Sequence, residues 1–144
     1  MTGQRVQIYT DGACSGNPGP AGAGVLLEYQ GTQLLLSKYL GTGTNNIAEL
    51  TAVKMALEAM KDRNRPVDLH SDSSYVIGLL TKNWKARQNT ELVEEIRRLL
   101  SGFRDVRFIK VKGHAGIAKN ELADELARKA VETRKDMQER KSMD

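Results

Sequence analysis

The chain has 144 residues, of which 40% are hydrophobic and 28% charged, as expected for one globular domain with a single core. No apolar run approaches the roughly 20 residues of a membrane helix, and the start lacks the apolar segment of a signal peptide. The single cysteine, Cys14, excludes an intrachain disulfide, so a reducing, cytoplasmic location without membrane contact is expected. The net charge of +4 permits a polyanionic partner but does not require one.

The elements predicted along the chain follow the order βββαβααβα. Alternating apolar residues between glycine- and proline-rich turns predict strands at residues 4–10, 22–29 and 32–40. Apolar residues at helical spacing predict a helix over about 46–62. The later elements are predicted as a strand at 67–70, a short helix at 71–80, an amphipathic helix at 89–103, a strand at 106–111 and a final helix after a loop at 112–120. This order favours a mixed sheet with helices packed on it.

Two acidic residues stand where predicted strands end. Asp11 follows the first strand, and Asp72 follows the strand that contains His70. Each has an ordinary local explanation, because Asp often begins a turn and often caps the N-terminus of a helix. A mixed sheet can also bring these two strand ends side by side, where unpaired carboxylates are costly to bury.

Two further acidic residues lie on predicted helices, beside apolar residues that must face the sheet. Glu49 comes three residues after Asn46, which is the spacing of a capping box. Asp124 comes four residues before Arg128, so an exposed ion pair would account for it. Taken singly, each acid therefore has a purely structural interpretation.

The four acids taken together indicate a metal site. Converging carboxylates would repel one another and shift toward the protonated form, and divalent cations would remove that repulsion. Mg²⁺ prefers oxygen ligands and keeps positions for water and phosphate, and two such ions about 4 Å apart suit phosphodiester cleavage. Neither nucleotide-binding glycine motif is present, and Cys14, His70 and His114 are too few to suggest a zinc site.

Four segments resemble the motifs of type 1 ribonuclease H, in the same order and over about residues 5–131: "YTDGACSGNPGPAGAG", "TNNIAELTAVKMALEAM", "SDSSYV" and "KGHAGIAKNELADELARKA". The resemblance implies the ribonuclease H-like α/β fold, with a five-stranded mixed sheet whose first three strands are antiparallel and with helices on both faces. Residues 1–132 would form the catalytic domain and residues 133–144 a charged C-terminal tail.

The resemblance also implies an activity. This is the endonucleolytic hydrolysis of the RNA strand of RNA–DNA hybrids, which leaves 5′-phosphate and 3′-hydroxyl ends. It requires two Mg²⁺ ions per site, with Mn²⁺ as a substitute, and no small-molecule cofactor. Two alternatives stay open: a non-catalytic nucleic-acid-binding module on the same fold, and a nuclease of the same superfamily with relaxed substrate specificity.

The family's metal-binding acids fall on Asp11, Glu49, Asp72 and Asp124, and its mobile catalytic histidine falls on His114. By this resemblance Asp11 contacts both ions. Glu49 and Asp72 bind the ion nearer the leaving group, and Asp72 and Asp124 bind the ion that activates water. His114, in a loop flanked by glycines, would move a proton or assist product release.

Substrate contacts are implied for the turn after the first strand and for the start of the first helix, together with Glu49. These residues would line the minor groove, where the 2′-hydroxyl distinguishes RNA from DNA, and Thr44 would hold a DNA phosphate. Turn and cap chemistry also explains the asparagines, and both roles are compatible. The residues are Cys14, Ser15, Gly16, Asn17, Thr44, Asn45 and Asn46.

The chain departs from many family members by lacking a basic protrusion after the third motif. The segment "LLTKNWKARQNTEL" is too short for it. Trp84 and Lys85 would instead stack on a sugar and neutralise phosphates, although Trp84 also suits a core anchor. The tail over 133–144 either substitutes for the protrusion or is a solvated helix end or a disordered segment. No exposed apolar stripe is predicted, so a monomer is expected.

Overall fold

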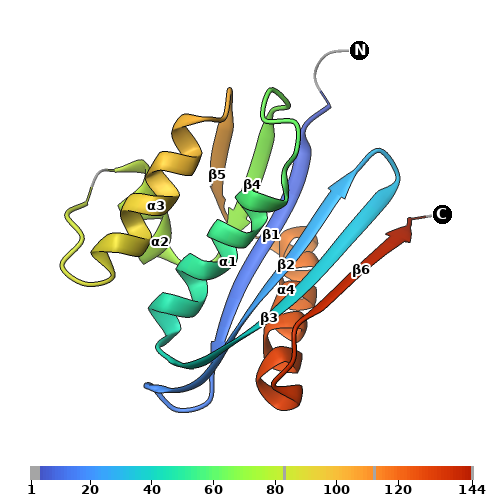
Figure 1. The fold of residues 1–144 in the computed structure, drawn as a ribbon. Coiled ribbons are helices and arrows are strands. Elements are labelled where there is room, and N and C mark those ends of the chain that lie inside the picture. Colours follow the sequence, from blue (N-terminus) through green and yellow to red (C-terminus); the bar gives the residue numbers. More distant parts are fainter. Residues whose placement is uncertain (1–3, 83, 112, 144) are drawn as a thin grey trace.

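The computed structural model describes residues 4–82, 84–111 and 113–143, without the side chains of residues 113–116. The described residues form one mixed sheet with helices on both faces (Figure 1). The strands are β1 (Val6–Cys14), β2 (Gly19–Tyr29), β3 (Thr32–Gly43), β4 (Val67–Ser71), β5 (Val106–Lys110) and β6 (Met137–Ser142). The helices are α1 (Asn45–Ala59), α2 (Ser74–Thr81), α3 (Thr90–Ser101) and α4 (Gly113–Thr133).

The strands lie in the order β5-β4-β1-β2-β3-β6. β1 and β2 pair antiparallel, as do β2 and β3, and β6 pairs antiparallel with β3. β4 and β5 extend the sheet as parallel strands from the other side of β1. The predicted mixed sheet, with its three antiparallel first strands, is confirmed. The sheet has six strands rather than the expected five.

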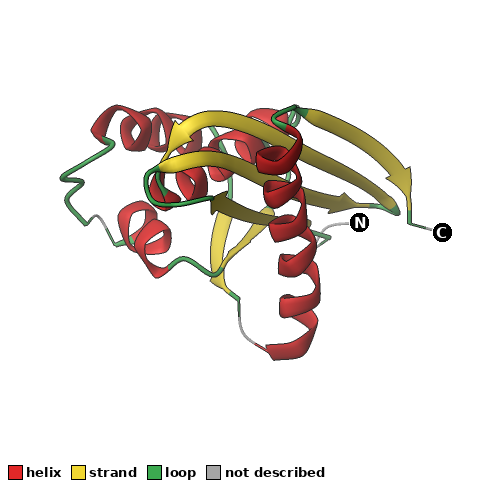
Figure 2. Ribbon diagram, turned by 90° about the horizontal axis from the view of Figure 1, so that it is seen from below, coloured by secondary structure: helices red, strands yellow, loops and turns green. Residues whose placement is uncertain are grey.

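The sheet separates two apolar cores. α1, α2 and α3 cover one face, and α4 crosses the other (Figure 1, Figure 2). The larger core joins Ile8 and Leu50 to the apolar sides of α2 and α3, and the smaller joins Tyr9 and Leu26 to Ala123 of α4. None of the helices in the described part of the chain has the length and apolar character that a membrane span requires.

Two glycines allow helices to approach the sheet at backbone distance. A Cβ on Gly12 of β1 would lie 2.5 Å from the backbone nitrogen of Glu49 in α1. A Cβ on Gly24 of β2 would lie 2.7 Å from the backbone nitrogen of Ala127 in α4. Since Gly24 is the pairing partner of Asp11, both helices approach the sheet beside this acid.

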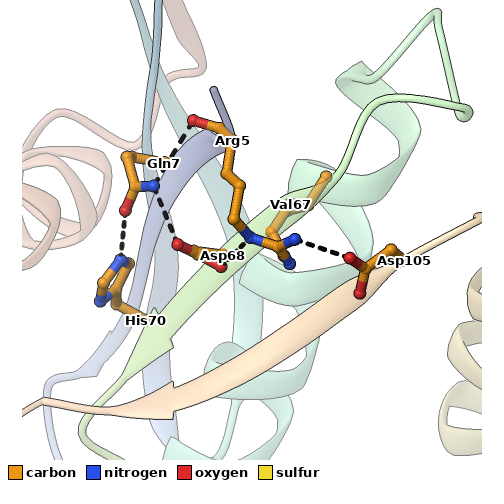
Figure 3. A network of polar contacts seen from close by, with 6 residues as sticks. All are labelled: Arg5, Gln7, Val67, Asp68, His70 and Asp105. Carbon is orange, nitrogen blue, oxygen red and sulfur yellow. Dashed lines mark hydrogen bonds and ion pairs between the residues drawn. The ribbon is translucent and has the colours of Figure 1, made fainter. Parts of the chain in front are cut away.

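A polar network joins the parallel strands β1, β4 and β5 (Figure 3). Arg5 donates from Nε to Asp68 Oδ1 at 2.5 Å and from a guanidinium nitrogen to Asp105 Oδ2 at 2.6 Å. Gln7 links Asp68 to His70, whose ring stacks on Tyr9 with the centroids 4.2 Å apart. The network holds β4 against β1 and so fixes the end of β4, where Asp72 follows.

Most predicted boundaries shift by one to three residues, among them the end of the first helix, which lies at Ala59 instead of 62. Two boundaries near the acids shift further. β1 continues to Cys14 instead of ending before Asp11, because the glycine-rich segment predicted as a turn pairs with β2 through Cys14↔Ala21. α4 begins at Gly113, within the segment predicted as a loop. Its glycines suggested the loop, but the alanines and charged residues that follow are strong helix formers.

The sixth strand lies within the segment predicted as a charged tail. β6 pairs with β3 from Thr32↔Ser142 to Ser37↔Met137, so residues 137–142 are neither a helix end nor disordered. The side chains of β6 are polar and largely exposed, so the sequence shows no apolar alternation there. An edge strand of this kind is held mainly by backbone hydrogen bonds to its neighbour.

Candidate active site

Asp11 lies inside β1, just past the end of β4. The pairing of β1 with β4 ends at Tyr9↔His70, whereas its pairing with β2 continues to Cys14↔Ala21. Asp11 is buried, with 6% of its surface exposed. A buried carboxylate at this gap between strands requires compensation for its charge.

Glu49 reaches the site from the start of α1. Thr44 is the N-cap of α1 and accepts a hydrogen bond from the Ile47 N–H, so the capping-box explanation for Glu49 is wrong. Its Oε2 atom is buried and has no hydrogen-bond partner among the described residues. The close approach that Gly12 permits places the backbone of Glu49 against β1, next to Asp11.

Asp72 follows the last residue of β4 and is exposed. Ser73, and not Asp72, is the N-cap of α2, because its hydroxyl accepts the hydrogen bond from the Val76 N–H. The helix-capping explanation for Asp72 is therefore wrong as well, and its carboxylate is available to the site.

These three acids converge. One carboxylate oxygen from each of Asp11, Glu49 and Asp72 lies within 4.8 Å of the others. Burial and the charge of Asp72 raise the pKa of Asp11 above its ordinary value. Burial and the charge of Asp11 raise the pKa of Glu49 to about 9. Glu49 Oε2 is buried without a hydrogen-bond partner among the described residues, and the ionised forms of Asp11 and Glu49 are both disfavoured. This set of carboxylate oxygens therefore fits a hard divalent cation.

Asp124 stands apart from this group. It lies on α4 and accepts a hydrogen bond from Arg128 Nε at 2.9 Å, so the ion pair suggested by the sequence is present. Its negative charge contributes to the raised pKa of Asp11, although it is not among the three acids within 4.8 Å of one another. The structure therefore places it near the cluster, paired with its own cation.

The backbone of His114 lies in the first turn of α4. Its side chain lies outside the described part of the structure, so its catalytic role stays a prediction. Residues 113–120, which were predicted as part of the loop around it, belong to the helix.

The turn after β1 contacts the start of α1. Asn17 Oδ1 accepts a hydrogen bond from the Asn45 N–H at 3.2 Å. Next to this contact, Cys14 Sγ at the end of β1 donates to the carbonyl of Gly43 at the end of β3, at 3.3 Å. These bonds bring together the two segments predicted to bind substrate. The predicted residues in them are Cys14, Ser15, Gly16, Asn17, Thr44, Asn45 and Asn46.

Two side chains at the site were not predicted as functional. Asn120 is buried and donates from Nδ2 to Asp72 Oδ2 at 3.5 Å. Arg128, besides pairing with Asp124, borders a depression of about 390 Å³ that Cys14 and Asp124 also line. No local sequence pattern signalled Asn120, because its contact with Asp72 joins residues 48 apart in the chain.

Trp84 and Lys85 lie after α2 and are exposed. Trp84 exposes 46% of its surface, so it is not a core residue, although its ring packs on α2. The ammonium of Lys82 lies 5.9 Å from the ring centroid.

Comparison with known proteins gives concordant results. The RNase H family model matches residues 3–132. A ribonuclease H from Chlorobium phaeovibrioides is 43% identical over 89% of this chain and 96% of its own length. The crystal structure of RNase H1 from Halobacterium salinarum is 34% identical, with a TM-score of 0.74 over 90% of this chain and 99% of that chain. LC11-RNase H1 in complex with an RNA/DNA hybrid is 31% identical, with a TM-score of 0.78 over the same shares. On sequence, fold and order of motifs, the chain belongs to the ribonuclease H family.

Proposed function

We infer that this chain is an endoribonuclease that hydrolyses the RNA strand of RNA–DNA hybrids and leaves 5′-phosphate and 3′-hydroxyl ends. The observation that carries this function is the convergence of Asp11, Glu49 and Asp72 from three separate elements of a ribonuclease H fold. The hybrid bound to LC11-RNase H1 supports a hybrid as the substrate here.

Mg²⁺, with Mn²⁺ as a substitute, is the proposed cofactor. Asp11, Glu49 and Asp72 would hold it, and Asp124 would join them once its ion pair with Arg128 opens. When bound, two such ions stabilise charge on phosphate oxygens and lower the pKa of the attacking water. The oxygen-only donor set and the unpartnered Glu49 Oε2 support a hard cation.

The chain's own residues orient this donor set. The Gly12 N–H donates to Asp11 Oδ1 at 2.9 Å, and Asn120 donates to Asp72. Both bonds restrict carboxylates that must act in a fixed geometry. His114 is proposed to carry a proton to or from the reacting oxygens, because imidazole titrates near neutral pH.

Recognition of RNA is assigned to the turn after β1 and the start of α1. The hydrogen bond between Asn17 and the Asn45 N–H brings these two segments together and supports a shared polar surface with Ser15, Asn17, Asn45 and Asn46. Amide and hydroxyl groups can both donate to and accept from a 2′-hydroxyl, which is the group that distinguishes RNA from DNA. We also propose a monomer in a reducing, cytoplasmic compartment, in which Cys14 stays a thiol.

The test is one incubation series. Labelled hybrid, duplex RNA and duplex DNA are each incubated with Mg²⁺, Mn²⁺ or EDTA. Cleavage of the RNA strand of the hybrid with either metal ion, and none in EDTA, is the expected result. Cleavage of duplex RNA or DNA at a similar rate would instead indicate a nuclease of relaxed specificity.

The matched variants are Glu49→Gln and Glu58→Gln, two changes of an acid to its amide on the same helix. Glu58 is exposed at the far end of α1, so its variant is expected to keep full activity. Glu49→Gln and Asp11→Asn are expected to lower kcat by at least about a hundredfold. A hybrid that survives with both metal ions, or variants that retain wild-type rates, would contradict the assignment.

A further inference from the structure

Gly78 lies in the interior of α2 and is buried. Glycine is among the least favourable residues inside a helix, so a glycine at this position calls for a packing reason. That reason is Trp84. A Cβ on Gly78 would lie 2.5 Å from Cδ2 of the indole and closer still to Cε3 and Cζ3. Only a residue without a side chain lets the ring rest on the helix backbone.

The tryptophan is held on one side and open on the other. Its backbone N–H donates to the Gly78 carbonyl at 3.4 Å, and 46% of the residue's surface stays exposed. A ring that was only filling a core would be covered on both sides. Trp84 therefore presents an aromatic surface whose position is set by α2.

Arg97 of α3 holds Trp84 and the end of α2 together, and these are called the Trp84 unit. One of its guanidinium nitrogens donates to the Leu79 carbonyl at 2.8 Å and to the Trp84 carbonyl at 3.1 Å. The Leu79 carbonyl belongs to the last turn of α2, where carbonyl groups lack partners within the helix. Arg97 thus ties the end of α2, the backbone of Trp84 and α3 together through a single group.

The helix α2 sets the position of the Trp84 unit relative to Asp72. The helix begins at Ser74, two residues after Asp72. The indole packs on Gly78, four residues after Ser74, which corresponds to a rise of about 6 Å along the helix. Lys82 lies beside the ring, and Lys85 and Arg87 are exposed nearby, so the surroundings suit a phosphate backbone.

We propose that Gly78 and Arg97 are positioning residues that hold the indole of Trp84 as a fixed stacking surface for a nucleoside of the hybrid, on the α2 side of the cleaved bond. The proposal rests on the proposed function. In a chain that lacks the basic protrusion, a ring already held in place binds substrate without the cost of ordering a loop on contact.

The first measurement uses the fact that Trp84 is the only tryptophan in the chain. Its fluorescence therefore reports on this ring alone. In EDTA, where no turnover occurs, addition of hybrid is expected to quench the emission of the wild type. Gly78→Ala and Arg97→Ala are expected to shift the free-protein emission to the red, lower its anisotropy and weaken the quenching. Gly102→Ala and Arg98→Ala are the matched controls, because neither residue contacts Trp84 in the described structure and a Cβ on Gly102 meets only ordinary contacts.

The second measurement is a double-mutant cycle on KM and kcat for hybrid cleavage. Trp84→Ala is expected to raise KM about tenfold, since a stacked base contributes about 1–3 kcal/mol, with little change in kcat. Gly78→Ala or Arg97→Ala is expected to raise KM about fivefold in the wild-type background and not at all in the Trp84→Ala background. A purely structural role would raise KM in both backgrounds.

The outcomes distinguish a failure of the proposed function from a failure of the positioning role of Gly78 and Arg97. If the wild type does not cleave the hybrid, the proposed function fails. If it does, and Trp84→Ala leaves KM unchanged or the effect of Gly78→Ala persists without Trp84, the positioning role is wrong. Should Gly78→Ala fail to fold by circular dichroism, Arg97→Ala decides the question by the same cycle.

Discussion

Glu49 combines burial with two carboxylate neighbours, and both effects oppose its ionised form. Its pKa is therefore raised in the folded protein and ordinary in the unfolded chain. The stability that arises from this difference is fully present below about pH 4 and is lost as the pH rises toward the folded pKa of about 9. At neutral pH the metal-free protein is thus destabilised by a residue that is proposed to bind the metal ion.

Glu49→Gln is expected to stabilise the metal-free protein at pH 8. The amide carries no charge and can donate to Asp11, so the free energy of unfolding in EDTA should rise by about 1–3 kcal/mol. The gain should be much smaller at pH 4, where Glu49 is protonated in the folded state and mostly protonated in the unfolded state. Urea denaturation at both pH values measures it, with Glu58→Gln as the control. A gain of equal size at both pH values would show that charge is not the cause.

The sequence indicated Asp11, Glu49 and Asp72 because each stands beside a core element, where an acid without a partner is unusual. It did not indicate Asn120, whose contact with Asp72 joins α4 to the end of β4 across 48 residues of chain. No local pattern encodes such a contact. For Asp124 the sequence allowed both an ion pair with Arg128 and a role as a metal ligand. The ion pair is present, and it is compatible with the proposed metal ligand.

At the scale of elements, strands with an apolar pattern were predictable and the one without it was not. β1 to β4 carry residues that the two cores bury, and β5 packs the partly buried Val106 and Phe108 against the larger core. The apolar pattern of these strands is visible in the sequence. β6 buries little, with only Met137 packed against the smaller core. Its place is set by backbone pairing with β3 and by the hydrogen bond from the Tyr39 N–H to Asp136. The start of α4 was missed because glycines suggested a loop.

Removal of residues 137–144 is expected to destabilise the protein without impairing catalysis. The deletion exposes the edge of β3, so a lower unfolding midpoint and concentration-dependent self-association should follow. KM and kcat for the hybrid should stay near the wild-type values. Thermal unfolding, light scattering and steady-state kinetics measure these effects.

The double variant Arg140→Gln/Lys141→Gln keeps the strand and removes two of its cations, and it serves as the comparison for this deletion. A raised KM with a shallower salt dependence in both proteins would instead indicate that these cations bind the hybrid and substitute for the missing protrusion.

At the scale of the whole molecule, the acids whose ionised forms are most disfavoured, Asp11 and Glu49, lie together in the interior of the fold. The net charge of the chain is +4, yet Asp11 and Glu49 meet between β1 and α1 with no cation beside them among the described side-chain contacts. The polar network of Arg5 and the glycine contacts of α1 and α4 hold the surrounding elements in place despite this repulsion. Divalent cations bound at these acids would therefore be coupled to the stability of the entire domain.

Mg²⁺ is expected to raise the melting temperature of the wild type by several degrees. A ligand that binds only the folded state at a concentration about a hundredfold above its Kd stabilises it by about 2.7 kcal/mol, and at this chain length each kcal/mol corresponds to about 4 °C. The measurement is thermal unfolding at pH 8 in EDTA and in increasing Mg²⁺, with NaCl at matched ionic strength as the salt control. Asp11→Asn should lose most of the shift, because it removes a ligand from the cluster, whereas Glu58→Gln should keep it. An equal shift in NaCl, or an undiminished shift in Asp11→Asn, would mean that the cation acts on surface charge rather than at the three acids.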